Sequence, residues 1–305
     1  MGIKRMNLFA RIRQRIKTKM STTIVNKEGD YLSTETPIVG TLRYALSLPT
    51  PRRIIITVKD IILREMLYVN NDYTNIQSAV GTTIKASPQI VILSNHGIFA
   101  NITVYPTPGN WRPIVFAYAD CKNWLVKDCV SVANGDDGFN MFEGPSRIQF
   151  DRCVFKGTPK GSLVDSNTTN PCTNITYSEC LFKEVLIRTP NNSGQGIVTV
   201  RNCQIYVTQS GLETQRLGSQ TNIINNTFYN RSSFDYYPSR IQDIPITTPN
   251  VIYSEGNKWY INGVEQPFKV GQAGYGFIGG LPISDLMYSL TPFPCLLPDL
   301  TGVPV

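Results

Sequence analysis

Seven cysteines and one histidine are the side chains of this 305-residue chain that could most readily act as nucleophiles or metal ligands. Four of the cysteines, Cys129, Cys153, Cys180 and Cys203, are separated by 24, 27 and 23 residues. This spacing contains no Cys-x-x-Cys pair, and a single histidine, His96, excludes a triad or metal cluster that needs two. The sequence also lacks a glycine-rich phosphate loop and a nucleophile elbow. Positional regularity, rather than a known reactive motif, is the main feature of these cysteines.

The four cysteines each end a short phrase that recurs along the chain. Each phrase is an alternating apolar and polar run, typical of a β-strand, followed by a polar pair and then Cys or Asn. Five copies lie between Cys121 and Arg231, at 124–129, 147–153, 174–180, 197–203 and 221–226. The last copy ends in Asn226. A period of 23 to 27 residues with one such strand per repeat predicts a solenoid.

We predict an all-β fold, a single-stranded right-handed parallel β-helix with a short N-terminal helix and an extended C-terminal tail. In such a fold the repeated Cys and Asn side chains stack in one internal column, about 5 Å apart from coil to coil. We interpret the cysteines as buried core residues that remain reduced thiols.

Three segments are expected. Residues 1–22 form a basic arm; up to Met20 it holds seven Lys and Arg residues and no acid, which accounts for the net charge of +7. Its apolar residues Phe9, Ile12 and Ile16 fall at helical spacing, which predicts an amphipathic helix. Residues 23–250 form the β-helix. Residues 251–305 contain a terminal hairpin with a tight turn at Asn262-Gly263, then an apolar, proline-rich tail.

The two ends are candidates for contacts with other molecules. The arm either caps the solenoid or contacts a membrane, a nucleic acid or a protein, whereas the remaining body is formally neutral and does not imply nucleic-acid binding. The apolar tail must be covered, either by the flank of its own solenoid or by another subunit. Other protein subunits are therefore expected partners of both ends.

Shorter elements precede the repeat. A helix is predicted at 40–46 and the first buried strand at 52–58. Brief strands are predicted at 61–63, 67–69, 74–76, 83–84 and 90–93. Residues 105–113 are expected to form a loop, because their prolines cannot sit inside a parallel sheet.

The arm does not read as a targeting signal. Arg11, Arg13 and Arg15 interrupt its apolar residues and no small-residue cleavage site follows, so we predict no signal peptide. No transmembrane segment is expected either. Together with reduced cysteines this predicts assembly in a reducing cytoplasm, with secretion by a non-classical route as the alternative.

Further motifs resemble a known family. The segments 40–45, 54–56 and 67–70, followed by 129–131, 136–139, 160–164 and 181–190, occur in the order and near the spacing found in pectate lyases of the right-handed β-helix type. The resemblance covers roughly residues 40–230. It implies a site in which calcium, held by acidic side chains, bridges the enzyme and a uronate carboxylate. It also implies an arginine that removes the C5 proton in a β-elimination.

The resemblance assigns roles to three residues. Arg188 matches the catalytic arginine, Lys160 matches the lysine that contacts substrate, and Asp137 matches one acidic ligand. A second substrate-binding arginine of the family falls on Ser193. If the chain is active, Arg188 and Lys160 are its catalytic residues, and these two with Asp137 bind substrate.

The family's calcium ligands are mostly replaced. One acidic ligand falls on Met141, another on Lys127 and a third on or near Ile114. Calcium prefers several oxygen ligands, so we expect no cofactor unless the site survives in altered form. We predict that Lys127 forms a salt bridge with Asp137 in place of the metal. The nearby acids are interpreted as solvated turn residues rather than relocated ligands: Asp136, Glu143 and Asp165.

Three functions remain open at this point. The first is a non-catalytic structural or attachment component of a larger assembly such as a virion, as a decoration, capsid or tail protein. The second is a divergent polysaccharide lyase that uses Arg188 and Lys160. The third is a carbohydrate-binding adhesion module, for which an acidic polysaccharide is the expected partner.

Overall fold

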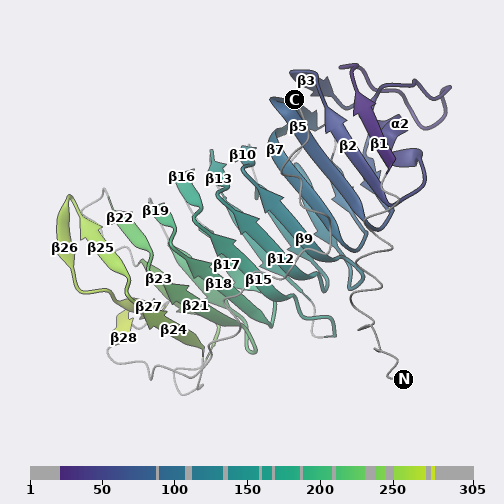
Figure 1. The fold of residues 1–305 in the computed structure, drawn as a ribbon. Helices are drawn as coiled ribbons and strands as arrows, with labels where there is room; N and C mark the ends of the chain where they lie inside the picture. Colours follow the sequence, from purple (N-terminus) through teal and green to yellow (C-terminus); the bar gives the residue numbers. More distant parts are fainter. Residues whose placement is uncertain are drawn as a thin grey trace, which may run out of the picture.

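The computed structural model describes residues 21–86, 89–106, 112–132, 137–157, 160–166, 169–185, 188–207, 211–230, 238–244, 251–272 and 276–278. These residues form the predicted right-handed parallel β-helix, which runs from α2 (Leu42–Ser47) at one end to β26 (Val264–Gln266) and β28 (Gly276–Ile278) at the other (Figure 1). Residues 1–20 and the tail after Ile278 lie outside the described residues, and the predictions for them stay predictions. No helix within the described ranges has the length and apolarity needed to cross a membrane.

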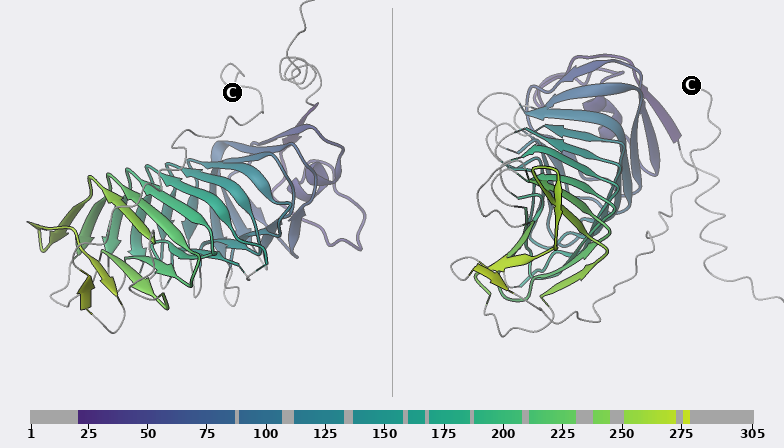
Figure 2. Two further views of the ribbon diagram at one scale, coloured as in Figure 1. Left: turned by 90° about the horizontal axis from the view of Figure 1, so that it is seen from below. Right: turned by 90° about the vertical axis from the view of Figure 1, so that its left-hand side faces the viewer.

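Each complete coil places strands on three faces, as the end view in Figure 2 shows. Face 1 is a sheet of its own, built from β4 (Leu67–Val69), β6 (Ile90–Ile92), β8 (Ile114–Ala117), β11 (Phe139–Phe142), β14 (Ser162–Asp165), β17 (Asn191–Ser193), β20 (Leu212–Gln215), β23 (Ser239–Gln242), β27 (Val270–Gln272) and β28.

Faces 2 and 3 belong to one larger sheet that turns a corner. Face 2 holds β1 (Ser21–Val25), β2 (Arg52–Ile56), the first parts of β5 (Thr74–Ala86) and β7 (Gly97–Pro106), β9 (Lys122–Lys127), β12 (Ser146–Asp151), β15 (Thr173–Ser178), β18 (Ile197–Arg201), β21 (Gln220–Ile224) and β24 (Ile252–Glu255). Face 3 holds β3 (Asp60–Ile62), the second parts of β5 and β7, β10 (Val130–Val132), β13 (Val154–Lys156), β16 (Leu181–Val185), β19 (Gln204–Val207), β22 (Thr227–Asn230), β25 (Lys258–Ile261) and β26.

The corner between faces 2 and 3 is a two-residue turn that recurs from coil to coil. Its first residue has a positive φ of 50° to 55°, at Asp128, Arg152, Glu179, Asn202 and Asn225. Its second residue is the predicted Cys or Asn, and these side chains are at most 1% exposed. The described cysteines are also free, in agreement with the prediction of reduced thiols. The predicted internal column is confirmed.

Hydrogen bonds along this column link successive coils. The thiols donate to main-chain carbonyl oxygens of the preceding coil, from Cys129 Sγ to Phe99 O at 3.4 Å and from Cys203 Sγ to Tyr177 O at 3.6 Å. Asn226 makes the same contact through its amide, at 2.8 Å to Val200 O. One further coil, ending in Asn257, continues the column, since Asn257 Oδ1 accepts from Asn226 N at 2.9 Å. Asn257 lies beyond the five repeats recognised in the sequence.

The interior between the faces is filled by aromatic rings from neighbouring coils. Phe155 stacks on Phe182 with ring centroids 4.5 Å apart, and Phe150 stacks on Tyr177 at 4.9 Å. Phe155 also contacts Phe150, Tyr177 and Phe139 edge-on at 5.7 to 5.8 Å. These rings belong to three successive coils, so their packing holds the middle of the solenoid together.

A helix, a hairpin and two short strands predicted from the sequence can be compared with the structure. The predicted helix is α2, whose first turn is capped by Thr41 Oγ1 accepting from Tyr44 N at 3.3 Å. The predicted hairpin is present as β25 and β26, joined through Asn262-Gly263 with positive φ at both residues. The two strands predicted at 74–76 and 83–84 are wrong as separate elements. They are the ends of one strand, β5, whose register shifts between Gln77 and Thr82 where it passes the corner.

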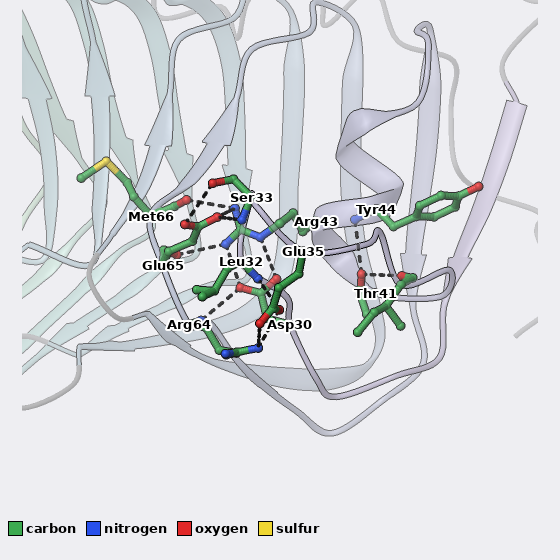
Figure 3. A network of polar contacts seen from close by, with 11 residues as sticks. Asp30, Leu32, Ser33, Glu35, Thr41, Arg43, Tyr44, Arg64, Glu65 and Met66 are labelled. Atoms are coloured by element: carbon green, nitrogen blue, oxygen red, sulfur yellow. Dashed lines mark hydrogen bonds and ion pairs between the residues drawn. The ribbon is translucent and has the colours of Figure 1, made fainter.

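Ion pairs fasten the first coil (Figure 3). Arg43 on α2 donates to both carboxylate oxygens of the buried Asp30, at 2.8 and 2.7 Å, and also to the carbonyl oxygens of Glu65 and Met66. Arg64 N donates to Asp30 Oδ2 at 3.0 Å. This arrangement ties α2 and the loop before it to the chain that follows β3.

The aromatic core predicts a large effect of one truncation. We expect Phe155→Ala to lower the free energy of unfolding by about 3–5 kcal/mol, because it leaves a cavity among four other rings. Urea unfolding followed by circular dichroism measures this. The control Val264→Ala, at an exposed position of β26, should change stability by less than about 0.5 kcal/mol. A comparable change in the two variants would contradict this account of the core.

The buried column predicts thiols that do not react in the folded protein. Burial raises the pKa of Cys129, Cys153 and Cys180, and raises that of Cys172 to about 12, so the reactive thiolate is scarce at pH 8. In a Cys295→Ser variant, which removes the one cysteine outside the described residues, Ellman's reagent should label no thiol until urea unfolds the chain. Rapid labelling under native conditions would show that the column is open to solvent.

Candidate functional site

The three residues assigned by resemblance come together where strands of face 1 begin. Asp137 lies two residues before β11, Lys160 two residues before β14 and Arg188 three residues before β17. These strands are neighbours in the sheet and pair in parallel register. The three side chains therefore leave the main chain at nearly equivalent positions of three successive coils.

Close main-chain contacts between successive coils hold these three positions together. Gly138 N donates to Gly161 O at 2.8 Å, and Ser162 N donates to Arg188 O at 3.0 Å. A Cβ atom at Gly161 would lie 2.8 Å from Arg188 O, so a side chain there would push the coils apart. Glycine at this position lets the main chain of Arg188 approach that of the coil before it.

The central contact of the site is an ion pair between Arg188 and Asp137. Arg188 Nη1 lies 2.8 Å from Asp137 Oδ2, across two coils. The Asp137 side chain is fully buried, whereas that of Arg188 is 25% exposed. The guanidinium therefore neutralises a carboxylate that water does not reach.

The predicted salt bridge between Lys127 and Asp137 is wrong. Lys127 ends β9 on face 2, where the register places it opposite Asp151 and Ala100, and the ion-pair partner of Asp137 among the described residues is Arg188. The reason is geometric. The corner turn at Asp128-Cys129 and the third face both lie between Lys127 and Asp137, so ten residues of sequence separation place them on different sides of the coil.

Asp165 is not a solvated turn residue. It ends β14, and its Oδ1 lies 2.6 Å from Arg216 Nη1 and accepts from Ser193 Oγ at 3.2 Å. Ser193, the position of the missing family arginine, is buried and serves as a partner of this carboxylate. Glu143 has a positive φ of 59° directly after β11, as expected of a turn residue. Asp136 lies outside the described residues.

A third acid on face 1, Glu213, was not predicted as a site residue. Glu213 on β20 is buried; its Oε1 lies 2.6 Å from Arg240 Nη2, and its Oε2 accepts from Asn191 Nδ2 at 2.8 Å. The signal was present in the register, since Asn191, Glu213 and Arg240 occupy one position of successive coils. Alignment of the repeats by their phrases would have placed these three polar residues next to one another.

The residues of face 1 do not fit a calcium site. Asp137, Asp165 and Glu213 each form an ion pair with an arginine: Arg188, Arg216 and Arg240. No group of three or more His, Cys, Asp or Glu side chains suited to a metal ion occurs within the described ranges. Calcium takes six to eight oxygen ligands, and here the carboxylates point at guanidinium groups instead.

Comparison with known structures identifies proteins that share this fold. The chain is similar to Jun a 1, the major allergen from cedar pollen, with a TM-score of 0.64 and 16% identity over 86% of each chain. It is also similar to the pectate lyase PelN from Paenibacillus sp. 0602, with a TM-score of 0.55 and 15% identity over 74% of this chain and 72% of that one. The fold is that of the pectate lyases. No protein-family profile and no curated protein matches the sequence.

The pectate-lyase-like fold thus carries a face 1 that is lined by acid–arginine pairs. Identities of 15% and 16% establish the shared fold and not a shared activity. What this surface can do follows from its own chemistry, which is a set of partly buried ion pairs with Lys160 at the same level.

The ion pair makes a prediction about stability. We expect Arg188→Ala to lower the free energy of unfolding by about 3 kcal/mol, because the buried carboxylate of Asp137 loses its guanidinium. Arg188→Ala combined with Asp137→Asn should recover most of this loss. Arg152→Ala, which breaks an exposed pair with Asp128, should cost less than about 1 kcal/mol. Urea denaturation compares the variants, and equal losses for Arg188→Ala and Arg152→Ala would refute the interpretation.

Proposed function

We propose that this chain is a non-catalytic β-helix that serves as a structural or attachment component of a larger assembly containing several copies of it, such as a virion. The observation that carries the proposal is the pair between Arg188 and the buried Asp137. A lyase of this fold would need that guanidinium free to approach the proton beside a uronate carboxylate, and it would need acids free to hold calcium. Here Arg188 Nη1 is instead paired with Asp137 Oδ2.

The N-terminal end offers the contact surface. Among the described residues β1 pairs only with β2, so its other side is a sheet edge, and Ile24 on this strand is 46% exposed. Unpaired edges favour association with another chain. Residues 1–20 of the basic arm precede this edge directly, and we assign the contact between subunits to these residues and to the edge of β1.

A divergent uronate lyase is the second candidate. Arg188 remains partly exposed, and Lys160 lies at the equivalent position of the neighbouring coil. An acidic polysaccharide could meet both cations there. The pair with Asp137 would have to open before Arg188 could act.

One experiment separates the two candidates. Polygalacturonate is incubated with the wild-type protein, with and without calcium, and the ultraviolet absorbance of unsaturated uronate is followed. We expect no product in either case. Product formed by the wild type and lost in Arg188→Ala would overturn the structural proposal and establish the lyase.

A second experiment tests the assembly. In sedimentation velocity we expect the full chain to form an oligomer and a chain lacking residues 1–20 to remain monomeric, with an unchanged far-ultraviolet circular dichroism spectrum. A full chain that stays monomeric, or a truncated chain that still forms the oligomer, would contradict the role given to the N-terminal end.

A further inference from the structure

Outward-facing residues of face 2 are buried or half-buried where β2, β5, β7 and β9 lie side by side. Ile76, Phe99 and Val126 point into the core, so Asn75, Ile98 and Leu125, each one residue earlier and in register with one another, point outward. Residues on the outside of a solenoid normally meet water. Asn75 is nevertheless 0% exposed, and Ile98 is 8% exposed.

The apolar residues of this surface form a cluster separate from the main core. Ile98 and Ala100 on β7 are packed with Leu125 on β9 and with Tyr73, just before β5. Tyr73 in turn stacks on His96, with ring centroids 4.7 Å apart. We call these five residues together with Arg53, Asn75 and Gln77 the outer patch.

Five polar atoms of the outer patch are buried without a hydrogen-bond partner: Arg53 Nε, Asn75 Nδ2, Asn75 Oδ1, Gln77 Oε1 and His96 Nδ1. Leaving a buried donor or acceptor unpaired costs about 1–3 kcal/mol each, so such atoms rarely gather without a reason. The set contains both donors and acceptors. A metal ion or an anion could satisfy only one kind, whereas the main chain of a polypeptide offers N–H and C=O groups in alternation.

We propose that the outer patch binds the C-terminal segment of this same chain, residues 279–305, in extended form. The segment is mostly apolar and contains five prolines, which favour extended over helical conformations. It can therefore cover Ile98, Ala100 and Leu125 with side chains while its main chain meets the amides of Asn75 and Gln77.

Charge favours this occupant over the N-terminal arm. The segment carries two charges, Asp285 and Asp299, and no Lys or Arg. Within the outer patch and around its residue His96, the cations Arg53, Lys122 and Arg147 outnumber the acid Asp72. The arm carries seven basic residues and no acid, so this surface would repel it.

The segment is also long enough. It follows β28, at the far end of the helix from β5 (Figure 1). Its 27 residues span about 90 Å when extended. The seven strand steps on face 2 from β24 back to β5 amount to about 34 Å. The segment can return along the solenoid and still bury its last residues on the outer patch.

Hydrogen–deuterium exchange of the full-length protein tests the proposal. We expect amides within 279–305 to exchange slowly in the wild type and roughly tenfold or more faster in Ile98→Asp, because a charge in the patch would displace the segment. The matched control is Ile62→Asp, which places the same charge at an exposed position of β3 on another face. It should leave exchange in 279–305 unchanged.

The sole histidine provides an independent readout. The imidazole signals of His96 in proton NMR should shift on deletion of residues 279–305 and keep their positions on deletion of residues 1–20. A synthetic peptide of residues 279–305 added to the shortened protein should restore them. If Ile98→Asp does not fold, Leu125→Ser with the same two readouts takes its place.

The proposal would be overturned by unprotected amides in 279–305 of the wild type, by equal effects of Ile98→Asp and Ile62→Asp, or by protection that disappears on dilution. The last would make a second copy of the chain the occupant. Sensitivity of His96 to deletion of residues 1–20 alone would point to the arm instead. None of these outcomes depends on lyase activity or on assembly through residues 1–20, so this inference can fail while the proposed function stands.

Discussion

The stacking of one corner turn on the next is the constraint on which the rest of this molecule depends. At the corners from Asp128 to Asn225 a residue with positive φ is followed by Cys or Asn, and that side chain donates to a carbonyl oxygen of the coil before it, as Cys153 does to Val126 O at 3.4 Å and Asn226 does to Val200 O at 2.8 Å. A thiol is a weaker donor than an amide, but it is small and tolerates full burial. The column therefore sets the register of faces 2 and 3 without introducing unpaired polar groups.

Because successive coils repeat that register, the place of a residue in the repeat determines its position along the face 1 strand. This explains why Arg188 reaches Asp137 and Arg216 reaches Asp165 across the same sequence separation of 51 residues. In both cases an arginine spans two coils to an acid at the start or the end of a face 1 strand. On face 1 the scaffold presents ion pairs that each link one strand to the second one along the sheet.

The sequence predicted what depends on the period. The repeated phrases located five of the face 2 strands, the Cys column and the corner that follows each of these strands. Local turn residues separately located α2 and the hairpin at Asn262-Gly263. Prediction failed where an interaction crosses faces or skips a coil. Matching Lys127 to a family ligand gave no information on which face it occupies, and a pair 51 residues apart, such as Arg216 with Asp165, is invisible to a comparison of adjacent repeats.

The same distinction explains where function should be sought in this fold. Inward positions are filled mostly by apolar side chains such as Ile, Phe, Val and Cys, so they report mainly on packing. Outward positions are free to vary unless something binds them, and only there does a buried polar atom without a partner carry information about an occupant. Asn75 and Gln77 on face 2 are such positions, while Asn191 and Glu213 on face 1 are outward, buried and linked by a hydrogen bond. Both faces keep buried polar atoms without a partner, Asn191 Oδ1 and Arg240 Nε on face 1 and the side-chain amides of Asn75 and Gln77 on face 2, but on face 2 these atoms lie beside the separate apolar cluster of Ile98 and Ala100.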